Sequence, residues 1–383
     1  MPEIWLRYGT TDVALDIRFE NLYKEIAPRV VPLQEDQINS KLRGIPLKDN
    51  CLLIVFSSTP ATKQVLTSLV NSAINKGVTG NIMIPLKLKE FIDVRNEKWS
   101  SSLLSGEDLL ALKGTMAKFD QTLFLSHSSY DPLFGFEGTP THLLRKFMKD
   151  KMAEAIALRG TDMPSPGTMS EPYRLALSLC SDIDALSVEI VGDSNRISDV
   201  FWGSIDESFK NASSKLTENT NLEQQQVKSE IISPGSELFY HSTLADSLNS
   251  LWNCISVLNR NGSAILLSES RRGLGSEALQ TYIEGRSHIS SSTGNSKYVD
   301  GQEHLIFLEA VQERYNLGIV STIPEYYLRT KLGFETFDSL KQVLGNLLSR
   351  HGKNHKVTLV SDAHFTLPLV ERDFNDGDLK HQK

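Results

Sequence analysis

The sequence has few cysteines, no long apolar run and no cluster of basic residues, and each absence excludes a class of protein. Its 383 residues include only 3 cysteines, Cys51, Cys180 and Cys254, which lie far apart in apolar surroundings. They form no CxxC pair, so they predict neither a disulfide framework nor a cysteine-type zinc site, and we expect them to be buried as small hydrophobic side chains. No segment approaches the roughly 20 apolar residues that cross a bilayer, so we expect no membrane span.

Charge and composition describe a folded protein that does not bind nucleic acid. The formal net charge is −7, and no stretch of Lys and Arg provides the basic surface that nucleic-acid binding needs. With 40% hydrophobic and 23% charged residues, the chain can bury full cores. The N-terminus lacks a basic flank followed by an apolar core, which predicts a cytoplasmic protein. At roughly 100–200 residues per domain, the length predicts two domains.

Strands and helices alternate along the chain, which is typical of α/β domains with mainly parallel sheets. After a predicted hairpin at 4–17, the unbroken apolar run at 51–56 precedes a polar turn and a helical pattern through 65–74, which indicates a strand–loop–helix unit. Further predicted strands lie at 81–85, 122–127, 186–191, 231–232, 263–267, 317–320 and 356–360, and further helices at 141–158, 242–258, 305–315 and 337–348.

A polar, helix-like stretch at 209–228 marks the predicted interdomain region. We therefore predict an N-terminal α/β domain over 1–226 and a C-terminal α/β domain over 227–383. Each is expected to hold a mainly parallel sheet flanked by helices, with a cleft between the domains. A second polar tract at 287–296 has almost nothing apolar to bury and is predicted to be an exposed loop.

Several landmarks, in this order, resemble the lactate racemase family of two-domain α/β proteins. In the second half, residues 265–275 (ILLSESRRGLG) are similar to a family strand that ends in an acidic residue, a cysteine and a Gly-Leu-Gly turn. Residues 319–325 (IVSTIPE) and 357–368 (VTLVSDAHFTLP) resemble the family's late strand and its closing segment. In the first half, Leu6-Arg7-Tyr8-Gly9 resembles the opening strand and 134–138 (FGFEG) the glycine-containing cofactor loop.

The resemblance implies a racemase or epimerase of 2-hydroxy acids, an isomerase. In the family a nickel ion is held by a pincer cofactor tethered to a lysine, one histidine coordinates the metal, and other histidines act as acid and base. Here the tether position falls near Thr141, which has no amine, and a family histidine falls near Asp131. We therefore expect a degenerate nickel-pincer site, no bound cofactor and no metal.

Other family positions also differ. An acidic residue and an arginine of the family's first loop fall on Ser57 and Pro60, and its Gly-x-His-Arg segment is replaced by 85–88 (PLKL). The Tyr-Gln and Lys that face substrate align with Ser242, Thr243 and Asp246. No compensating cluster is evident in the sequence. Lys146, Lys149 and Lys151, on the helix after Thr141, are the lysines that could replace the tether.

The predicted ligand cleft is lined by residues 131–138 and 269–275. Asp131 is either a weak catalytic candidate or a turn residue before proline, and the turn is preferred. Glu269 is either an acid with a raised pKa or the partner of an arginine, and pairing is preferred. Arg271 and Arg272 either bind a carboxylate or phosphate or are solvated, and these alternatives are balanced. The remaining candidate ligand-binding residues are Gly135, Gly138, Thr141, Gly273 and Gly275.

The histidines carry little signal by spacing. His127 and His142 flank the glycine-containing loop and could form a metal pair if the loop folded back, although a surface histidine is the commoner case. The other histidines form neither HxxH nor HExxH, which excludes a metalloprotease.

Two hypotheses from different classes follow. The first is a lactate-racemase-like protein acting on a small anion such as a 2-hydroxy acid. The alternative is a noncatalytic small-anion-binding or regulatory protein that uses the same cleft. An enzyme needs several ionisable side chains with shifted pKa values around the cleft, whereas a sensor needs only one or two anion anchors. Whether the chain forms a homo-oligomer stays open.

Overall fold

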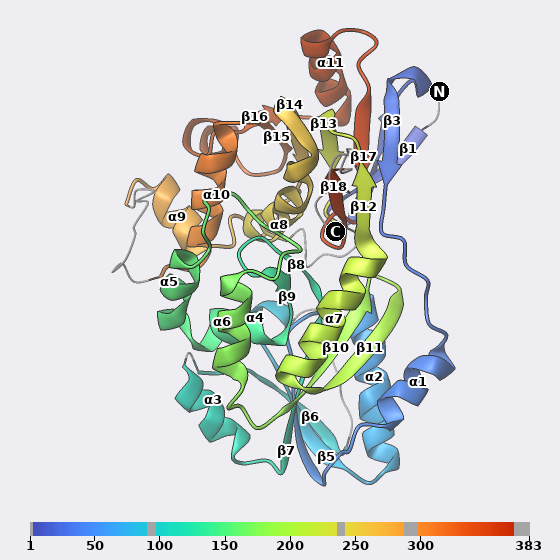
Figure 1. The fold of residues 1–383 in the computed structure, drawn as a ribbon, viewed down its shortest axis with the longest axis vertical. Coiled ribbons are helices and arrows are strands. Elements are labelled where there is room, and N and C mark those ends of the chain that lie inside the picture. Colours follow the sequence, from blue (N-terminus) through green and yellow to red (C-terminus); the bar gives the residue numbers. More distant parts are fainter. Residues whose placement is uncertain (1–2, 90–96, 107, 236–241, 287–297, 371–383) are drawn as a thin grey trace, which may run out of the picture.

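The computed structural model describes residues 3–89, 97–106, 108–235, 242–286 and 298–370. Its first large sheet has six strands in the order β11-β10-β7-β4-β5-β6, and lies in the lower half of Figure 1. All neighbours in this sheet are parallel except β10 and β11. The strands are β4 (Asn50–Val55), β5 (Thr79–Ile84), β6 (Trp99–Leu103), β7 (Gln121–His127), β10 (Leu186–Gly192) and β11 (Ile197–Ser204).

The second large sheet also has six strands, in the order β16-β15-β14-β13-β17-β3, and every neighbouring pair is parallel. Its strands are β3 (Leu22–Ile26), β13 (Val227–Ile232), β14 (Leu258–Leu267), β15 (Asn316–Val320), β16 (Glu335–Phe337) and β17 (Val357–Val360). Three two-stranded sheets complete the fold: β1 (Glu3–Tyr8) with β2 (Thr11–Asp16), β8 (Ser129–Asp131) with β9 (Gly135–Glu137), and β12 (Asn221–Gln224) with β18 (Leu367–Val370).

Helices cover both faces of the large sheets, which explains the unbroken apolar runs in the strands. In β4, Leu53 and Val55 belong to one hydrophobic cluster with α1 and α2, while Leu52 and Ile54 belong to another that includes α4 to α6 and continues to α8 and α10 of the second sheet. The helices are α1 (Glu35–Arg43), α2 (Pro60–Asn75), α3 (Leu109–Met116), α4 (Thr139–Phe147), α5 (Lys149–Ala157), α6 (Glu171–Cys180), α7 (Ile205–Thr220), α8 (Leu244–Cys254), α9 (Glu277–Ile283), α10 (Gln302–Gln312) and α11 (Leu340–His351).

The predicted α/β class with mainly parallel, helix-flanked sheets is confirmed. The division at residue 226 stays a prediction. The first strands of the chain, although they precede residue 226, belong with the second large sheet. β3 pairs with β17 in the second sheet, and Leu6 and Leu15 of the β1–β2 hairpin pack on that sheet. The first sheet is therefore formed by residues 50–204, between two segments that contribute to the second.

Some sequence predictions need correction and others hold. The single helix expected at 141–158 is two helices, α4 and α5, because Met148 between them leaves the helical conformation with φ −131° and ψ 46°. All three cysteines are buried and unpaired, as expected. Within the described ranges no helix has the length and apolarity of a membrane span. The polar tract at 287–296 lies outside the described residues.

Candidate active site

The candidate site lies where the carboxyl ends of the two large sheets meet. In each sheet the order along the chain reverses beside one strand, between β4 and β7 in the first and between β13 and β17 in the second. Open α/β sheets bind ligands at such switch points. The two points are in contact, because the ring of His127 at the end of β7 lies 4.5 Å from that of Phe365, which follows β17.

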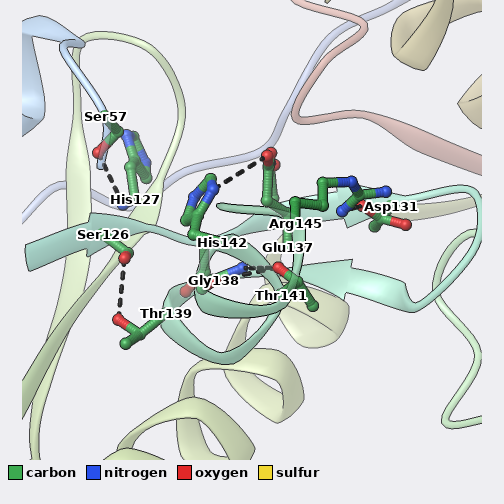
Figure 2. A network of polar contacts seen from close by, with 12 residues as sticks. Ser57, Ser126, His127, Asp131, Glu137, Gly138, Thr139, Thr141, His142 and Arg145 are labelled. Atoms are coloured by element: carbon green, nitrogen blue, oxygen red, sulfur yellow. Dashed lines mark hydrogen bonds and ion pairs between the residues drawn. The ribbon is translucent and has the colours of Figure 1, made fainter. Parts of the chain in front are cut away.

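His127 is a buried residue of the first switch point. Its backbone N–H donates to Ser57 Oγ at 2.9 Å, and its Nδ1 lies 2.8 Å from Thr59 Oγ1, the N-cap of α2. Burial lowers the pKa of His127 to about 3, so its imidazole is neutral at pH 7. Figure 2 shows Ser57 and His127 beside the start of α4.

The start of α4 is held by a buried carboxylate. Glu189 on β10 accepts hydrogen bonds from Thr139 N (3.0 Å), Ser187 Oγ (2.8 Å) and Ser128 Oγ (3.0 Å). Burial raises the pKa of Glu189 to about 7 in spite of these donors. This anchoring fixes the first turn of α4, from which His142 and Arg145 project one turn apart on the same face.

A pocket of about 110 Å³ opens between the two sheets, and we call it the central pocket. Loops and helices of both sheets contribute to it. Its ionisable lining residues are Lys87, Glu137, His142, Arg145, Asp246, Asp300, Glu303, His304 and His364. These ionisable side chains, which the sequence did not indicate as a group, are assembled from segments up to 277 residues apart, the span from Lys87 to His364.

Glu137 lies between two imidazoles at the centre of this cluster. His142 Nδ1 is 3.8 Å from Glu137 Oε1, and His364 Nε2 is 3.6 Å from Oε2, which also accepts a hydrogen bond from Ser129 Oγ at 2.6 Å (Figure 2 shows the His142 pair). Burial opposes ionisation of Glu137, but His142 and His364 hold its pKa well below the usual range. Burial also lowers the pKa of His142 to about 4, against the attraction of Glu137. At neutral pH the arrangement is a carboxylate beside neutral imidazole.

Arg145 joins the two halves of the site. Its guanidinium donates to Asp131 Oδ2 at 2.6 Å and to Glu303 Oε1 of α10 at 3.2 Å, and lies 4.9 Å from the ring centroid of Phe134. Burial acts against the charge of Glu303, but Arg145 lowers its pKa. The positive charge of Arg145 is therefore balanced by protein carboxylates rather than left for a ligand.

His304 has a defined tautomer. Trp252 Nε1 donates to His304 Nδ1 at 3.1 Å, and burial lowers the pKa of His304. A neutral imidazole that accepts at Nδ1 carries its proton on Nε2. His304 is thus a hydrogen-bond donor at the central pocket, while the nearby Asp300, whose pKa is raised by burial and by Glu303, favours its protonated form more than an exposed carboxyl does.

The predicted loop residues have structural roles. Asp131 Oδ1 accepts from the backbone N–H of Leu133 and Phe134 at 2.8 Å each, which is the predicted turn, and Oδ2 binds Arg145. Gly135 has φ +85°, and a Cβ there would lie 1.8 Å from a backbone oxygen. Gly138 leaves no room for a Cβ beside Phe209. These glycines shape the loop that carries Glu137.

Thr141 closes the first turn of α4. Its Oγ1 donates to Gly138 O at 3.0 Å and accepts from Gly138 N at 3.1 Å, and its side chain is buried. None of the three lysines suggested as replacements for a tether, Lys146, Lys149 and Lys151, lines the central pocket.

The second segment predicted to line the cleft, residues 269–275, lies only partly at the central pocket. Glu269 lies against Gly9, 3.5 Å from Arg271 Nε, so it pairs with an arginine as preferred and lies outside the central pocket. Arg271 and Arg272 are exposed.

Only the end of the Gly-Leu-Gly turn reaches the pocket. Gly275 lines it, with φ +73° and a Cβ position only 2.2 Å from Thr243 Oγ1. Gly273 has φ +80° and open space around it. Arg272 Nη1 donates to Lys87 O at 3.4 Å, which links this turn to the segment that carries Lys87.

The metal pair suggested for His127 and His142 has no support from a third ligand. Over the described ranges, no group of three or more His, Cys, Asp or Glu side chains is arranged to hold a metal ion. The signal that could have identified His364 and Glu137 was their position in the segments that follow the parallel strands β17 and β7, beyond the carboxyl ends of these strands.

Comparisons with known proteins identify the fold. No family model matches the sequence, and no curated protein matches it. Among solved structures, the lactate racemase apoprotein from Thermoanaerobacterium thermosaccharolyticum aligns with a TM-score of 0.72 and 13% identity over 97% of this chain and 100% of that one. A Thermotoga maritima protein solved by a structural genomics consortium aligns with a TM-score of 0.66 and 12% identity, over 89% and 99%. The chain therefore has the two-domain α/β fold of that racemase, as the sequence resemblance predicted.

Proposed function

We propose that this chain binds a small 2-hydroxy acid in the central pocket and acts on it as an isomerase of the racemase or epimerase type. The observation that supports this is Glu137 flanked by His142 and His364 in a pocket between two α/β sheets. Several ionisable groups with shifted pKa values converge there, which favours an enzyme over a sensor that needs only one or two anchors.

The size of the pocket limits the ligand. A volume of about 110 Å³ is well below the roughly 300–1,000 Å³ of pockets for drug-sized ligands, and suits an acid of a few heavy atoms. Lys87, which lines the pocket, provides positive charge for the carboxylate. Donation from His304 Nε2–H would help to orient the substrate.

His142 is the proposed base. If its Nδ1–H faces Glu137, its Nε2 is the unprotonated nitrogen, and among the described residues this atom has no hydrogen-bond partner. The Glu137 carboxylate would stabilise the imidazolium that forms when Nε2 takes a proton. The proton transfers balance without an oxidant or reductant: His142 Nε2 would take the proton from C2, the protonated Asp300 carboxyl, which also lines the pocket, would return one to the opposite face, and exchange with water would restore both groups. Lys87 would stabilise the charge that develops on the carboxylate.

The nickel-pincer cofactor of the family does not fit these residues. The tether position holds Thr141, whose hydroxyl is buried in the helix cap, and the pocket is too small for a nucleotide-derived group. The mechanism proposed here therefore uses no nickel.

A noncatalytic anion-binding protein is the second candidate. It is favoured by one observation, namely that Lys87 and the Nε2–H of His304 both line the pocket, because two such anion anchors are all that a sensor needs.

The test is exchange at C2 in D₂O. Purified protein is incubated with each enantiomer of lactate and of a larger 2-hydroxy acid. Loss of the C2 proton signal is measured by NMR, together with the optical rotation of the solution. We expect exchange and racemisation, reduced about 100-fold or more in His142→Gln but not in Glu313→Gln, an exposed control position outside both pockets. Binding without exchange would replace the isomerase by the second candidate, and absence of both would exclude either function at this pocket. Intact mass of protein from cells that make the pincer cofactor should stay unmodified.

A further inference from the structure

A second pocket, of about 580 Å³, lies at the opposite end of the second sheet from the central pocket. It is formed at the amino ends of β3, β13 and β17, together with the loop that leads from α11 to β17, at the top of Figure 1. We call it the basic pocket and define it by Tyr23, Lys228, His351, Lys353, His355 and Lys356. Among the residues that the structure describes, no carboxylate lines it.

Its charge is opposite to that of the whole chain, which is −7. Lys228, Lys353 and Lys356 contribute three positive charges, and none of them forms an ion pair within the part of the chain that the structure describes. The two histidines add little charge, because burial lowers the pKa of both. Burial, and then the neighbouring His351 and Lys228, lower the pKa of His355 to about 4. The three ammonium groups are exposed, so water and salt screen much of their repulsion, and a bound anion would supply the counter-charge that the described residues lack.

The loop that carries two of these lysines is held in place. Asn21, which is buried, donates from Nδ2 to the backbone oxygens of Lys353 at 2.8 Å and of His355 at 2.9 Å. His355 Nε2 lies 2.8 Å from Ser229 Oγ on β13, and its ring centroid is 4.6 Å from that of His351. The backbone of the pocket is therefore ordered before any ligand arrives, which lowers the entropic cost of binding.

The size and chemistry select the class of ligand. A volume of 580 Å³ lies within the range for small-molecule and cofactor sites. Lysine ammonium groups bind phosphate as point charges, and three of them match a ligand with two or more phosphate charges. Tyr23 at the rim is 43% exposed and offers a ring face for stacking.

We propose that the basic pocket binds a small molecule with a di- or triphosphate group, its phosphates on Lys228, Lys353 and Lys356. This site is separate from the central pocket and does not depend on the function proposed there.

The test is calorimetric titration of the full chain at low salt with ADP, pyrophosphate and inorganic phosphate. We expect saturable binding of ADP and pyrophosphate at one site, weaker binding of phosphate, and about tenfold weaker binding by the double variant Lys353→Gln/Lys356→Gln, since each exposed ion pair contributes up to about fivefold. Lys113→Gln/Lys118→Gln on and after α3 is the matched control, because it removes the same charge from exposed positions outside the pocket.

Comparison of ADP with pyrophosphate also shows whether the pocket recognises a nucleotide or the polyphosphate group alone. Tighter binding of ADP than of pyrophosphate, with the difference lost in Tyr23→Leu, would identify a nucleotide, whereas equal binding would identify the polyphosphate group alone, and both support the proposal. The His351 and His355 imidazole signals should shift on addition of either ligand. No saturable binding at millimolar concentration, or equal loss of affinity in the two double variants, would overturn it.

Discussion

Glu230 should make the protein less stable as the pH rises, and its replacement by glutamine should remove that effect. The residue lies on β13 and is fully buried. Among the described residues its Oε1 accepts a hydrogen bond from Gln224 Nε2 at 3.5 Å, and its Oε2 has no hydrogen-bond partner. Burial therefore raises the pKa of Glu230 from 4.5 to about 8.

The direction of the effect follows from which state holds the proton. Below about pH 4.5 the carboxyl is protonated both folded and unfolded, so its stabilising contribution is complete. Between pH 4.5 and about 8 the unfolded chain has released the proton and the folded chain has kept it, so stability falls with pH. The slope is about 1.4 kcal/mol per pH unit, and the total is on the order of 5 kcal/mol.

The assay is urea unfolding at pH 5, 6, 7 and 8 for the natural chain and Glu230→Gln. Glutamine keeps the shape and the contact with Gln224, so the variant should gain stability relative to the natural chain with each pH unit. Buried Glu189 and Asp362 titrate in both proteins and cancel in the difference. Glu313→Gln, which removes an exposed carboxylate, is the control and should show no trend. A stability difference that stays constant from pH 5 to 8 would refute the reasoning.

Two further predictions concern the linkage between the sheets. Arg145→Met should destabilise the protein by about 3–5 kcal/mol at pH 7, because Asp131 and Glu303 are left buried without their partner. In urea unfolding the loss should shrink at acidic pH as Glu303, whose pKa Arg145 lowers, takes up a proton, and a loss independent of pH would contradict this account. The second variant, Gly275→Ala, should lower the free energy of unfolding by about 1–3 kcal/mol in thermal unfolding, because the added Cβ would meet Thr243 and the φ of residue 275 is positive. An unchanged melting temperature would show that the turn can shift.

The sequence predicted the parts of the fold whose signals are local. β4 and β7 are unbroken apolar runs followed by polar turns, and both were expected because strands buried on two faces must be apolar throughout. β3 was not, because Tyr23 and Lys24 make an edge strand that resembles a loop. β3 belongs to the second sheet because it pairs with β17, and a pairing between segments so far apart in the sequence cannot be predicted from the local sequence of either strand.

The candidate site was only partly predictable for the same reason. Asp131 as a turn residue could be predicted, since Asp before proline has a local preference. The group of Glu137, His142 and His364 could not, because no sequence spacing relates the last of these to the others. These three side chains come together because the switch points of the two sheets face each other. The topology of the sheets, and not a sequence motif, therefore determines the site.

The pairing of β3 with β17 also has a consequence for synthesis on the ribosome. Asn21 and Lys353, which join across this edge, are separated by 332 residues. At a typical rate of translation, the early strand waits roughly 15–70 s for its neighbour, while residues 50–204 already contain every strand of the first sheet. We therefore expect the interior segment to fold during translation and the second sheet to close last, when the final strands emerge and join the first ones made.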